Sequence, residues 1–312
     1  MSIQSGSAKD ITITILSRKS DDRSIIDKKT ITVHIVSKTA GTGNKGILMC
    51  GDSRTWHRVY GIQGETYLQD GNKTITTELK RLLDSNKGAA FTFYGTFQSE
   101  LDPTVKNLAQ SGWKFDNAIQ TINAAGGIKQ YIEVSCGAGS GATLDYCTCM
   151  YGINDLMDWN AKNISQYDYS TLKIDGILAK CKEFISLVKA GYPNCKIIVV
   201  IEMTTCANQD GFAFWDGNKT KVNTHREVEK AQKLFRKKLI KMIETDYAED
   251  SNVILSSAGI WCDRLWGFPY TMSTESSRCS REKVFFRNNV HPHDDGYKQT
   301  SDGIFSTIKF LE

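Results

Sequence analysis

The sequence predicts a three-layer α/β/α protein with a central, mostly parallel β-sheet and a short extra β segment at its N-terminus. Three observations support this fold class. From residue 46 onward, short apolar runs alternate with amphipathic helical patterns, which is typical of parallel strands joined by helices. Residues 10–37 instead carry segments in which apolar and polar side chains alternate. The 312 residues, 40% of them hydrophobic, suffice for one large packed domain.

The N-terminal segment reads as two half-buried strands. Residues 11–15 and 31–36 alternate between β-branched apolar residues and polar ones, and a charged turn at 20–23 separates them. Two strands alone are marginally stable in water, so we expect them to belong to an Ig-like or similar β-module. Small residues at 39–44 follow as a linker. We therefore divide the chain into residues 1–44, a β-strand segment with its linker, and residues 45–312, the main domain.

The main domain is predicted from strands and helices that alternate along the chain. Short apolar runs indicate covered parallel strands at 47–50, 89–94, 145–151, 196–201 and 253–255. Helical patterns lie between or after them, around Leu79–Leu83 and at 115–124, 172–190, 223–245 and 294–310. For the third of these helices we expect a buried face of Ile177, Cys181, Phe184, Ile185 and Val188, and for the last one Tyr297, Ile304, Ile308 and Phe310.

Composition argues against nucleic-acid and membrane partners. The net charge is only +4, and the basic stretch 230–241 reads as the solvated face of a helix. No run of about 18 apolar residues occurs, so no membrane span is predicted. Residues 1–10 are polar and lack the apolar core of a signal peptide. Localisation stays open, because a cytoplasmic protein and a virion or phage-tail component both fit this pattern.

The sequence predicts no metal or cofactor. The nine cysteines include no Cys-x-x-Cys pair, so we interpret them mostly as small buried hydrophobes in a reducing compartment. No set of histidines and carboxylates has metal-ligand spacing. The glycine-rich stretch 137–141 lacks the Lys-Ser/Thr of a phosphate-binding loop, and we expect it to form a flexible loop over the binding cleft.

Four short motifs carry the candidate chemistry. Gly-Asp-Ser-Arg at 51–54 follows the first buried strand, where an open α/β sheet exposes residues to a ligand. Gly112 precedes a helix and lets the backbone N–H approach an oxyanion, and Asn154 offers a side-chain amide for the same purpose. His291 precedes the last helix and is suited to take a proton from the Ser53 hydroxyl near neutral pH.

Each motif also has a plain structural interpretation. Gly-Asp-Ser is an ordinary turn composition, and Gly112 taken alone is more often a loop glycine. Asn154 and Asp155 are typical helix-capping residues. The order of the four motifs along the chain is therefore more informative than any one of them.

In that order the motifs resemble the SGNH (GDSL-type) hydrolases, over residues 46–312. The resemblance implies a flavodoxin-like fold with Ser53 as nucleophile and His291 as general base. It also implies an oxyanion hole made by Ser53, Gly112 and Asn154, without a cofactor. Beside these motifs we expect Arg54, Trp113 and Asp155 to bind substrate.

One position departs from the family pattern. The family commonly has an aspartate three residues before the histidine, and here Asn288 occupies that place. An asparagine can accept the imidazole N–H and fix the tautomer but supplies no charge, so we expect a Ser–His dyad aided by Asn288 or by a backbone carbonyl. Asp294 and Asp295 follow the histidine, and we interpret them as favourable charges at a helix N-terminus.

The resemblance implies ester hydrolysis through an acyl-enzyme, and two features favour O-acetylated carbohydrate as the substrate. Six tryptophans, at 56, 113, 159, 215, 261 and 266, offer flat faces for sugar rings. No apolar lid or amphipathic surface helix suits a lipid interface. Ser-Gly-Trp at 111–113 also resembles the glycine block of polysaccharide acetylesterases.

Two other functions stay open. The chain fits a lipase or thioesterase of the same family. It also fits a non-catalytic carbohydrate-binding or structural module of a phage tail or surface protein, which Asn288 makes plausible. A β-module before such a domain is similar to phage tail proteins and to multidomain surface esterases of gut bacteria, so a larger assembly is a further expectation.

Overall fold

The computed structural model describes residues 9–18, 24–56, 73–86, 88–99, 102–156, 171–208, 225–276, 279–286 and 288–312. A seven-stranded sheet forms its centre, in the order β5-β6-β3-β7-β8-β9, with β4 also paired to β3. These strands are β3 (Asn44–Gly51), β4 (Ala90–Tyr94), β5 (Phe97–Gln98), β6 (Lys106–Ala109), β7 (Tyr146–Met150), β8 (Lys196–Val200) and β9 (Val253–Ser256). Only the β5–β6 pair is antiparallel among them, so the predicted fold class is confirmed.

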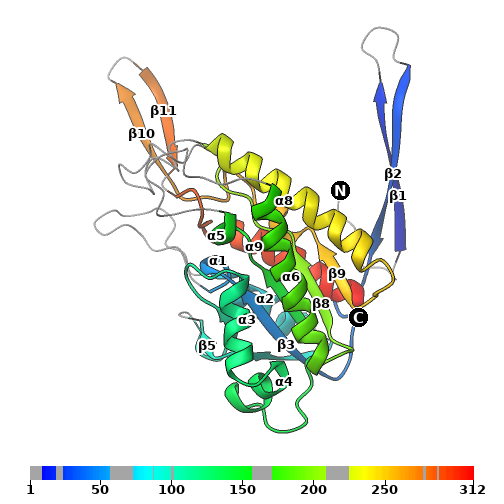
Figure 1. Ribbon diagram of the computed structural model, residues 1–312. Coiled ribbons are helices and arrows are strands. Elements are labelled where there is room, and N and C mark those ends of the chain that lie inside the picture. Colours follow the sequence, from blue (N-terminus) through cyan, green and yellow to red (C-terminus); the bar gives the residue numbers. More distant parts are fainter. Residues whose placement is uncertain are drawn as a thin grey trace.

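Helices cover both faces of this sheet (Figure 1). On one face lie α3 (Phe115–Ala124), α6 (Thr171–Gly191) and α8 (His225–Asp246), and on the other lie α2 (Ile75–Ser85) and α9 (Asp294–Leu311). Neighbouring residues of β3 separate between the two layers, because successive side chains of a strand point to opposite faces. Leu48 and Cys50 pack with α3, α6 and α8, whereas Ile47 and Met49 pack with α2 and α9.

Shorter elements complete the connections. They are α1 (Ser53–Trp56), α4 (Ile128–Gln130), the π-helical turn Tyr131–Ser135, α5 (Ile153–Leu156) and the 3-10 turn Ala258–Trp261. The sequence pattern does not predict β5, β6 or these turns, because none of them carries the continuous apolar run or the helical periodicity of the predicted elements. The predicted buried face of α6 is confirmed at all five positions.

Two expectations about side chains and loops are wrong. Phe310 is half exposed, unlike Tyr297, Ile304 and Ile308, and its ring instead lies 5.0 Å from that of His34, outside the main core. The stretch 137–141 does not cover the candidate site, since it leads to the amino end of β7, at the opposite edge of the sheet. It is also held by backbone bonds such as Gly139 N–H to the Glu133 carbonyl (3.0 Å), so it is an ordered turn.

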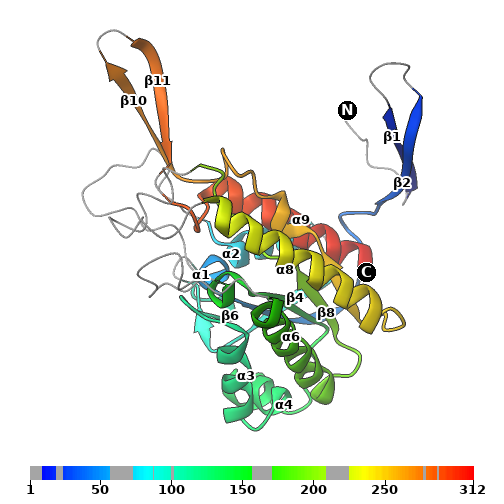
Figure 2. The same ribbon diagram turned by 45° about the horizontal axis from the view of Figure 1, so that its top comes forward.

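Two antiparallel hairpins project from the body (Figures 1 and 2). The first pairs β1 (Lys9–Arg18) with β2 (Ile25–Ile35), and the second pairs β10 (Tyr270–Ser276) with β11 (Cys279–Phe286). In the described residues β1 and β2 pair only with each other, and isoleucines such as Ile13 and Ile31 stay exposed on one face. The larger β-module expected around them stays a prediction, while the β10–β11 hairpin was not predicted.

The cysteines have the predicted environment. The eight whose side chains are described are all buried and none forms a disulfide. Burial raises the pKa of Cys50, on β3, which keeps the thiol protonated and inert. In the described part of the chain, no helix combines the length and the apolar character needed to cross a bilayer.

The placement of the first hairpin generates a prediction about stability. Deleting residues 1–35 should change the free energy of unfolding of the main domain by less than about 1 kcal/mol, because β1 and β2 add no strand to the central sheet. The linker should be kept, since Lys309 Nζ donates to the Ala40 carbonyl (2.8 Å). Urea unfolding of both chains measures the difference. A loss of several kcal/mol would mean that the hairpin belongs to the main folding unit.

Candidate active site

The candidate site begins with three neighbouring strands that end at one edge of the sheet. In the register of β3, Gly51 pairs with Ala109 of β6 on one side and with Met150 of β7 on the other. Ser53, Gly112 and Asn154 follow these three strand ends within four residues. Because the strands are parallel, residues about 50 and 100 positions apart in the sequence come to the same edge.

Ser53 starts the short helix α1 directly after β3. Gly51 is required just before it, because a Cβ there would lie 2.0 Å from Thr55 Oγ1. The turn closes through Thr55 N–H to the Asp52 carbonyl (3.0 Å), and Thr76 of α2 donates its hydroxyl to the Thr55 carbonyl (2.9 Å). Only 4% of Ser53 is exposed, so the hydroxyl sits in a tightly defined turn.

The structure brings His291 to this serine. His291 Nε2 and Ser53 Oγ are 2.7 Å apart, a hydrogen-bond distance, although the residues are 238 positions apart in the sequence. The imidazole is partly exposed, and Ser53 is its buried partner. This contact is the geometry that a general base needs to take a hydroxyl proton.

Asn288 does not contact the imidazole in the way expected from the sequence. Its Oδ1 accepts from the backbone N–H groups of Val290 (2.9 Å) and His291 (2.8 Å). These two bonds use both lone pairs of the amide oxygen, so it does not accept the imidazole N–H. Asn288 therefore shapes the backbone of the histidine loop, residues 288–293, and its side chain is buried there.

Two neighbouring elements hold this loop. Cys206, after β8, donates its N–H to the Asn289 carbonyl (3.0 Å). His293 caps α9 by accepting from Asp295 N–H at Nδ1 (3.0 Å), and Asp294 and Asp295 occupy the first turn of α9, as predicted. The backbone of the histidine loop is thus fixed on both sides of His291.

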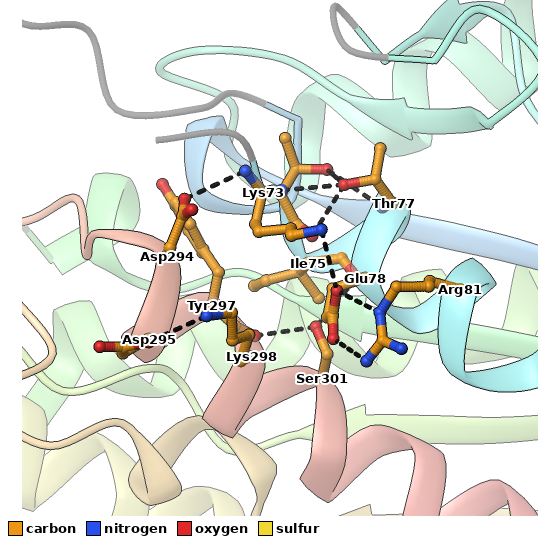
Figure 3. A network of polar contacts seen from close by, with 11 residues as sticks. Lys73, Ile75, Thr77, Glu78, Arg81, Asp294, Asp295, Tyr297, Lys298 and Ser301 are labelled. Carbon is orange, nitrogen blue, oxygen red and sulfur yellow. Dashed lines mark hydrogen bonds and ion pairs between the residues drawn. The ribbon is translucent and has the colours of Figure 1, made fainter. Parts of the chain in front are cut away.

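A polar network ties the first turns of α9 and α2 together (Figure 3). Asp294 Oδ1 accepts from Lys73 N–H (3.1 Å), and Ser301 Oγ donates to the Ile75 carbonyl (3.0 Å). Since α2 also binds the Ser53 turn through Thr76, one helix supports both the serine and the histidine segments. The bonds of α2 to both segments therefore help to fix the distance between Ser53 and His291.

Arg54 lies away from solvent, which does not fit the predicted role in substrate binding. Its side chain has no exposed surface and pairs with Asp52 through Nη2–Oδ2 (2.9 Å) and Nε–Oδ1 (3.2 Å). Arg54 Nη1 reaches the Met203 carbonyl (3.1 Å) and lies 3.7 Å from Glu202 Oε1. Burial disfavours the charged form, but Asp52 and Glu202 outweigh it and raise the pKa of Arg54. Arg54 thus anchors the nucleophile turn to the end of β8.

Sequence reasoning missed the acidic partners of this arginine. Asp52 and Glu202 are both fully buried, and Gln232 of α8 donates to Glu202 Oε1 (2.7 Å). A signal was available for Glu202, which directly follows the apolar run of β8, where a carboxylate is unexpected unless it is paired. The pairing of the two residues could not be predicted from local sequence, because Arg54 follows β3 and Glu202 follows β8.

The loop after β6 and the turn after β7 are bound to each other. Asn154 Nδ2 donates to the Trp113 carbonyl (3.0 Å), and Asp155 accepts from the backbone N–H of Phe115, at the start of α3. Gly112 has φ of 77°, which favours glycine, and a Cβ there would meet nothing within 4 Å. The segments that carry Gly112 and Asn154 are therefore bonded to each other at the edge of the sheet where β3 also ends.

Of the other two residues expected to bind substrate, only Trp113 retains a suitable position. Its ring is partly exposed and meets Phe97 edge to face at 5.2 Å. Asp155 instead faces α3, and its Oδ2 is buried without a hydrogen-bond partner. Burial raises the pKa of Asp155 to about 7. Its contacts are those of a helix cap, which is the plain structural interpretation.

Among the other histidines, the described side chain of His34 lies on the first hairpin, away from this arrangement. His34 binds Asp10 on the first hairpin (2.7 Å), and His57 lies outside the described residues. Across the described ranges, no three His, Cys, Asp or Glu side chains gather as metal ligands would.

The burial of Arg54 generates a prediction that separates a structural role from substrate binding. Arg54→Met should lower the free energy of unfolding by about 3–5 kcal/mol, because Asp52 would be left as an unpaired buried charge and Glu202 would keep only Arg236 as a charged partner. Urea unfolding measures this loss. A variant with normal stability and only a raised KM would restore the original assignment to substrate binding.

Asp155 generates a prediction about pH. Its folded pKa of about 7 lies above the ordinary value of 3.8, so its burial costs stability as pH rises from about 4 to 7. Asp155→Asn keeps a carbonyl oxygen for Phe115 N–H but cannot ionise. The variant should gain stability over the parent by up to about 4 kcal/mol at pH 8, with the difference shrinking towards pH 4. Parallel curves of stability against pH would contradict this.

Comparisons with known proteins address the family and the fold of the chain. The sequence profile of the GDSL-like lipase/acylhydrolase family matches residues 47–304. A family 3 carbohydrate esterase of Clostridium thermocellum has the same fold, with a TM-score of 0.51 at 17% identity, over 86% of this chain and 97% of that one. A carbohydrate esterase family 3 protein of Talaromyces cellulolyticus is similar with a TM-score of 0.45 at 14% identity, again over 86% and 97%. No curated protein matches significantly in sequence.

The profile match covers most of the chain and includes all four motifs. The chain therefore belongs to the GDSL-like lipase/acylhydrolase family, the SGNH hydrolases, and this membership supports an ester hydrolase.

Proposed function

We propose that this protein is a serine esterase that removes O-acetyl groups from carbohydrate. The observation that carries the proposal is the 2.7 Å contact between Ser53 Oγ and His291 Nε2 at the carboxyl edge of the sheet. A serine hydroxyl is a poor nucleophile unless a neighbouring base accepts its proton, and this contact supplies such a base. Gly112 and Asn154, beside the serine, offer donors for a developing oxyanion.

The reaction follows from these positions. Ser53 Oγ attacks the carbonyl carbon of the ester while His291 Nε2 takes the hydroxyl proton. The carbonyl oxygen becomes an oxyanion, which the backbone N–H groups of Ser53 and Gly112 and the Asn154 amide stabilise. Collapse of this tetrahedral intermediate expels the alcohol, which receives the proton from His291. Water then attacks the acyl-serine by the same route and releases the acid.

Asn288, Arg54 and Asp155 have supporting roles in this scheme. Asn288 stabilises the histidine loop through two hydrogen bonds to its backbone and so positions the residue that carries the imidazole. Arg54 holds the nucleophile turn, and Asp155 holds the start of α3 close to Asn154. These three residues position the reacting groups and need not touch the substrate.

The carbohydrate substrate rests on less direct support. The fold neighbour from Clostridium thermocellum is named a carbohydrate esterase, and Trp113, in the Ser-Gly-Trp block, stays partly exposed beside Asn154. A flat indole face near the oxyanion donors suits a sugar ring better than a mobile acyl chain. Acetyl is the acyl group that we expect.

Acetate release from O-acetylated polysaccharides, together with hydrolysis of p-nitrophenyl esters of increasing chain length, tests the proposal. The parent should release acetate and prefer acetyl to octanoyl esters, whereas Ser53→Ala and His291→Ala should both abolish turnover. Asn154→Ala should lower kcat by roughly 100-fold with little change in KM, because the amide acts in the transition state.

Each alternative function has its own outcome in this experiment. Preference for long acyl chains would indicate a lipase or thioesterase. Neither a burst nor turnover on p-nitrophenyl acetate would indicate a non-catalytic module. Normal turnover by Ser53→Ala would remove Ser53 from the mechanism.

A further inference from the structure

Exposed apolar side chains gather on one segment beside the histidine loop. Outside the first hairpin, six large hydrophobic residues are exposed among those described, and four of them lie between residues 260 and 266. They are Ile260, Trp261, Leu265 and Trp266. Trp266 is the most exposed of the four, at 55%. Trp261, in the turn after β9, is 47% exposed. Scattered apolar residues are normal on a surface, so the surroundings of each exposed residue decide whether it can form a binding site.

The turn that carries Trp266 is rigidly built. Asp263 Oδ1 accepts from the backbone N–H groups of Leu265 (2.8 Å) and Trp266 (2.9 Å), and Gly267 N–H donates to the Asp263 carbonyl (3.0 Å). Gln299 of α9 receives the Asp263 N–H at Oε1 (2.7 Å). Tyr270 meets the indole of Trp266 edge to face at 5.6 Å and supports one side of the ring. The indole is therefore exposed and held in place.

This turn lies against the loop that carries His291. His293 donates its backbone N–H to the carbonyl of Gly267, the residue after Trp266 (2.9 Å). Gly296 permits the close approach, since a Cβ there would lie 2.5 Å from the Gly267 carbonyl oxygen. Trp266 directly precedes Gly267, and the residue that Gly267 binds, His293, lies two positions after His291. The backbone next to Trp266 is therefore bonded to the histidine loop.

We propose that Trp266, supported by Tyr270, is a platform on which a sugar ring of the substrate chain stacks next to the acetylated residue. The proposal rests on the proposed function, because it assigns a binding subsite to the same esterase. A pyranose presents a face of C–H groups that packs against an indole, and such contacts tolerate hydroxyl groups at the ring edge. A rigid aromatic side chain loses little conformational entropy when it binds.

Trp261 provides a matched control within the same segment. It is the same residue type at similar exposure, but its ring packs against Gly303 of α9, 3.2 Å from the position of a Cβ there. Its Nε1 donates to Ser257 Oγ (3.2 Å). Gly303 lies seven residues beyond Gly296, so Trp261 sits about 10 Å farther along α9 from the histidine loop. A sugar bound at Ser53 should reach Trp266 and not Trp261.

The test compares Trp266→Ala, Trp266→Phe and Trp261→Ala with the parent on two substrates, O-acetylated xylan and p-nitrophenyl acetate. Trp266→Ala should raise KM for acetylated xylan about tenfold, because the apolar contact with the sugar is lost. Its kcat on xylan and its kinetics on p-nitrophenyl acetate should stay unchanged, since the small ester does not reach the platform. Trp266→Phe should recover most of the loss, and Trp261→Ala should behave as the parent.

Several results would overturn the platform. They are an equal effect of Trp261→Ala, an equal loss on both substrates, or an unchanged KM for Trp266→Ala. A change of oligomeric state in Trp266→Ala, measured by light scattering, would assign the patch to a second copy of the chain instead.

Failure of the proposed function is read separately. If the parent hydrolyses p-nitrophenyl acetate but releases no acetate from acetylated xylan, then acetylated xylan is not a substrate of this esterase. Binding of the Ser53→Ala variant to xylan in affinity gel electrophoresis, with and without Trp266→Ala, then decides the platform. Retardation that Trp266→Ala removes supports it, and no retardation, or retardation that persists, overturns it.

Discussion

The parallel pairing of β3 between β6 and β7 is the constraint on which the site depends. It sets Gly51 opposite Ala109 and Met150, so that three chain segments leave the sheet at one edge. The residues after these strand ends lie far apart in the sequence, and the strand register brings them to the same edge. A one-residue slip of β3 would turn its side chains to the other face and move Ser53 away from both partners. The two separate hydrophobic layers stabilise the register, because each β3 side chain has its own layer to fill.

Behind the edge, buried charges connect the nucleophile turn to the rest of the sheet. Arg54 reaches from that turn to the Met203 carbonyl at the end of β8, and Asp52 and Glu202 balance its charge. Two residues farther on, Thr205 and Cys206 continue the same segment, and Cys206 bonds the histidine loop at Asn289. The serine and histidine segments are thus linked through one stretch of chain after β8. A buried ion pair adds little net stability, but it strongly penalises arrangements in which it is broken.

The histidine loop shows how an asparagine fits at a position where relatives commonly have an aspartate. The carbonyl oxygen of Asn288 accepts two backbone N–H groups, which a carboxylate would do as well. This function of the side chain needs an acceptor and no charge. The backbone that carries His291 is held by this side chain, by the cap that His293 forms on α9 and by the bond from Cys206, after β8, to Asn289.

Local pattern alone determined much of this protein. The apolar runs and helical periodicities predicted β3, β7, β8, β9 and the main helices to within a few residues, because these elements are covered by the core and therefore carry such patterns. The ordered motifs also predicted that Ser53, Gly112, Asn154 and His291 form one site, and the structure shows the first and the last of them in contact.

Only the tertiary structure decided which way the flanking residues point. Arg54 and Asp155 stand beside the motifs in the sequence, yet the first is buried among charges and the second caps α3. Asn288 faces backbone instead of imidazole, and Phe310 meets His34 instead of the core. Such choices depend on partners far away in the chain, such as Glu202 for Arg54, and on short elements such as β6. Local periodicity cannot report them, because it records which residues are apolar and not which residues meet.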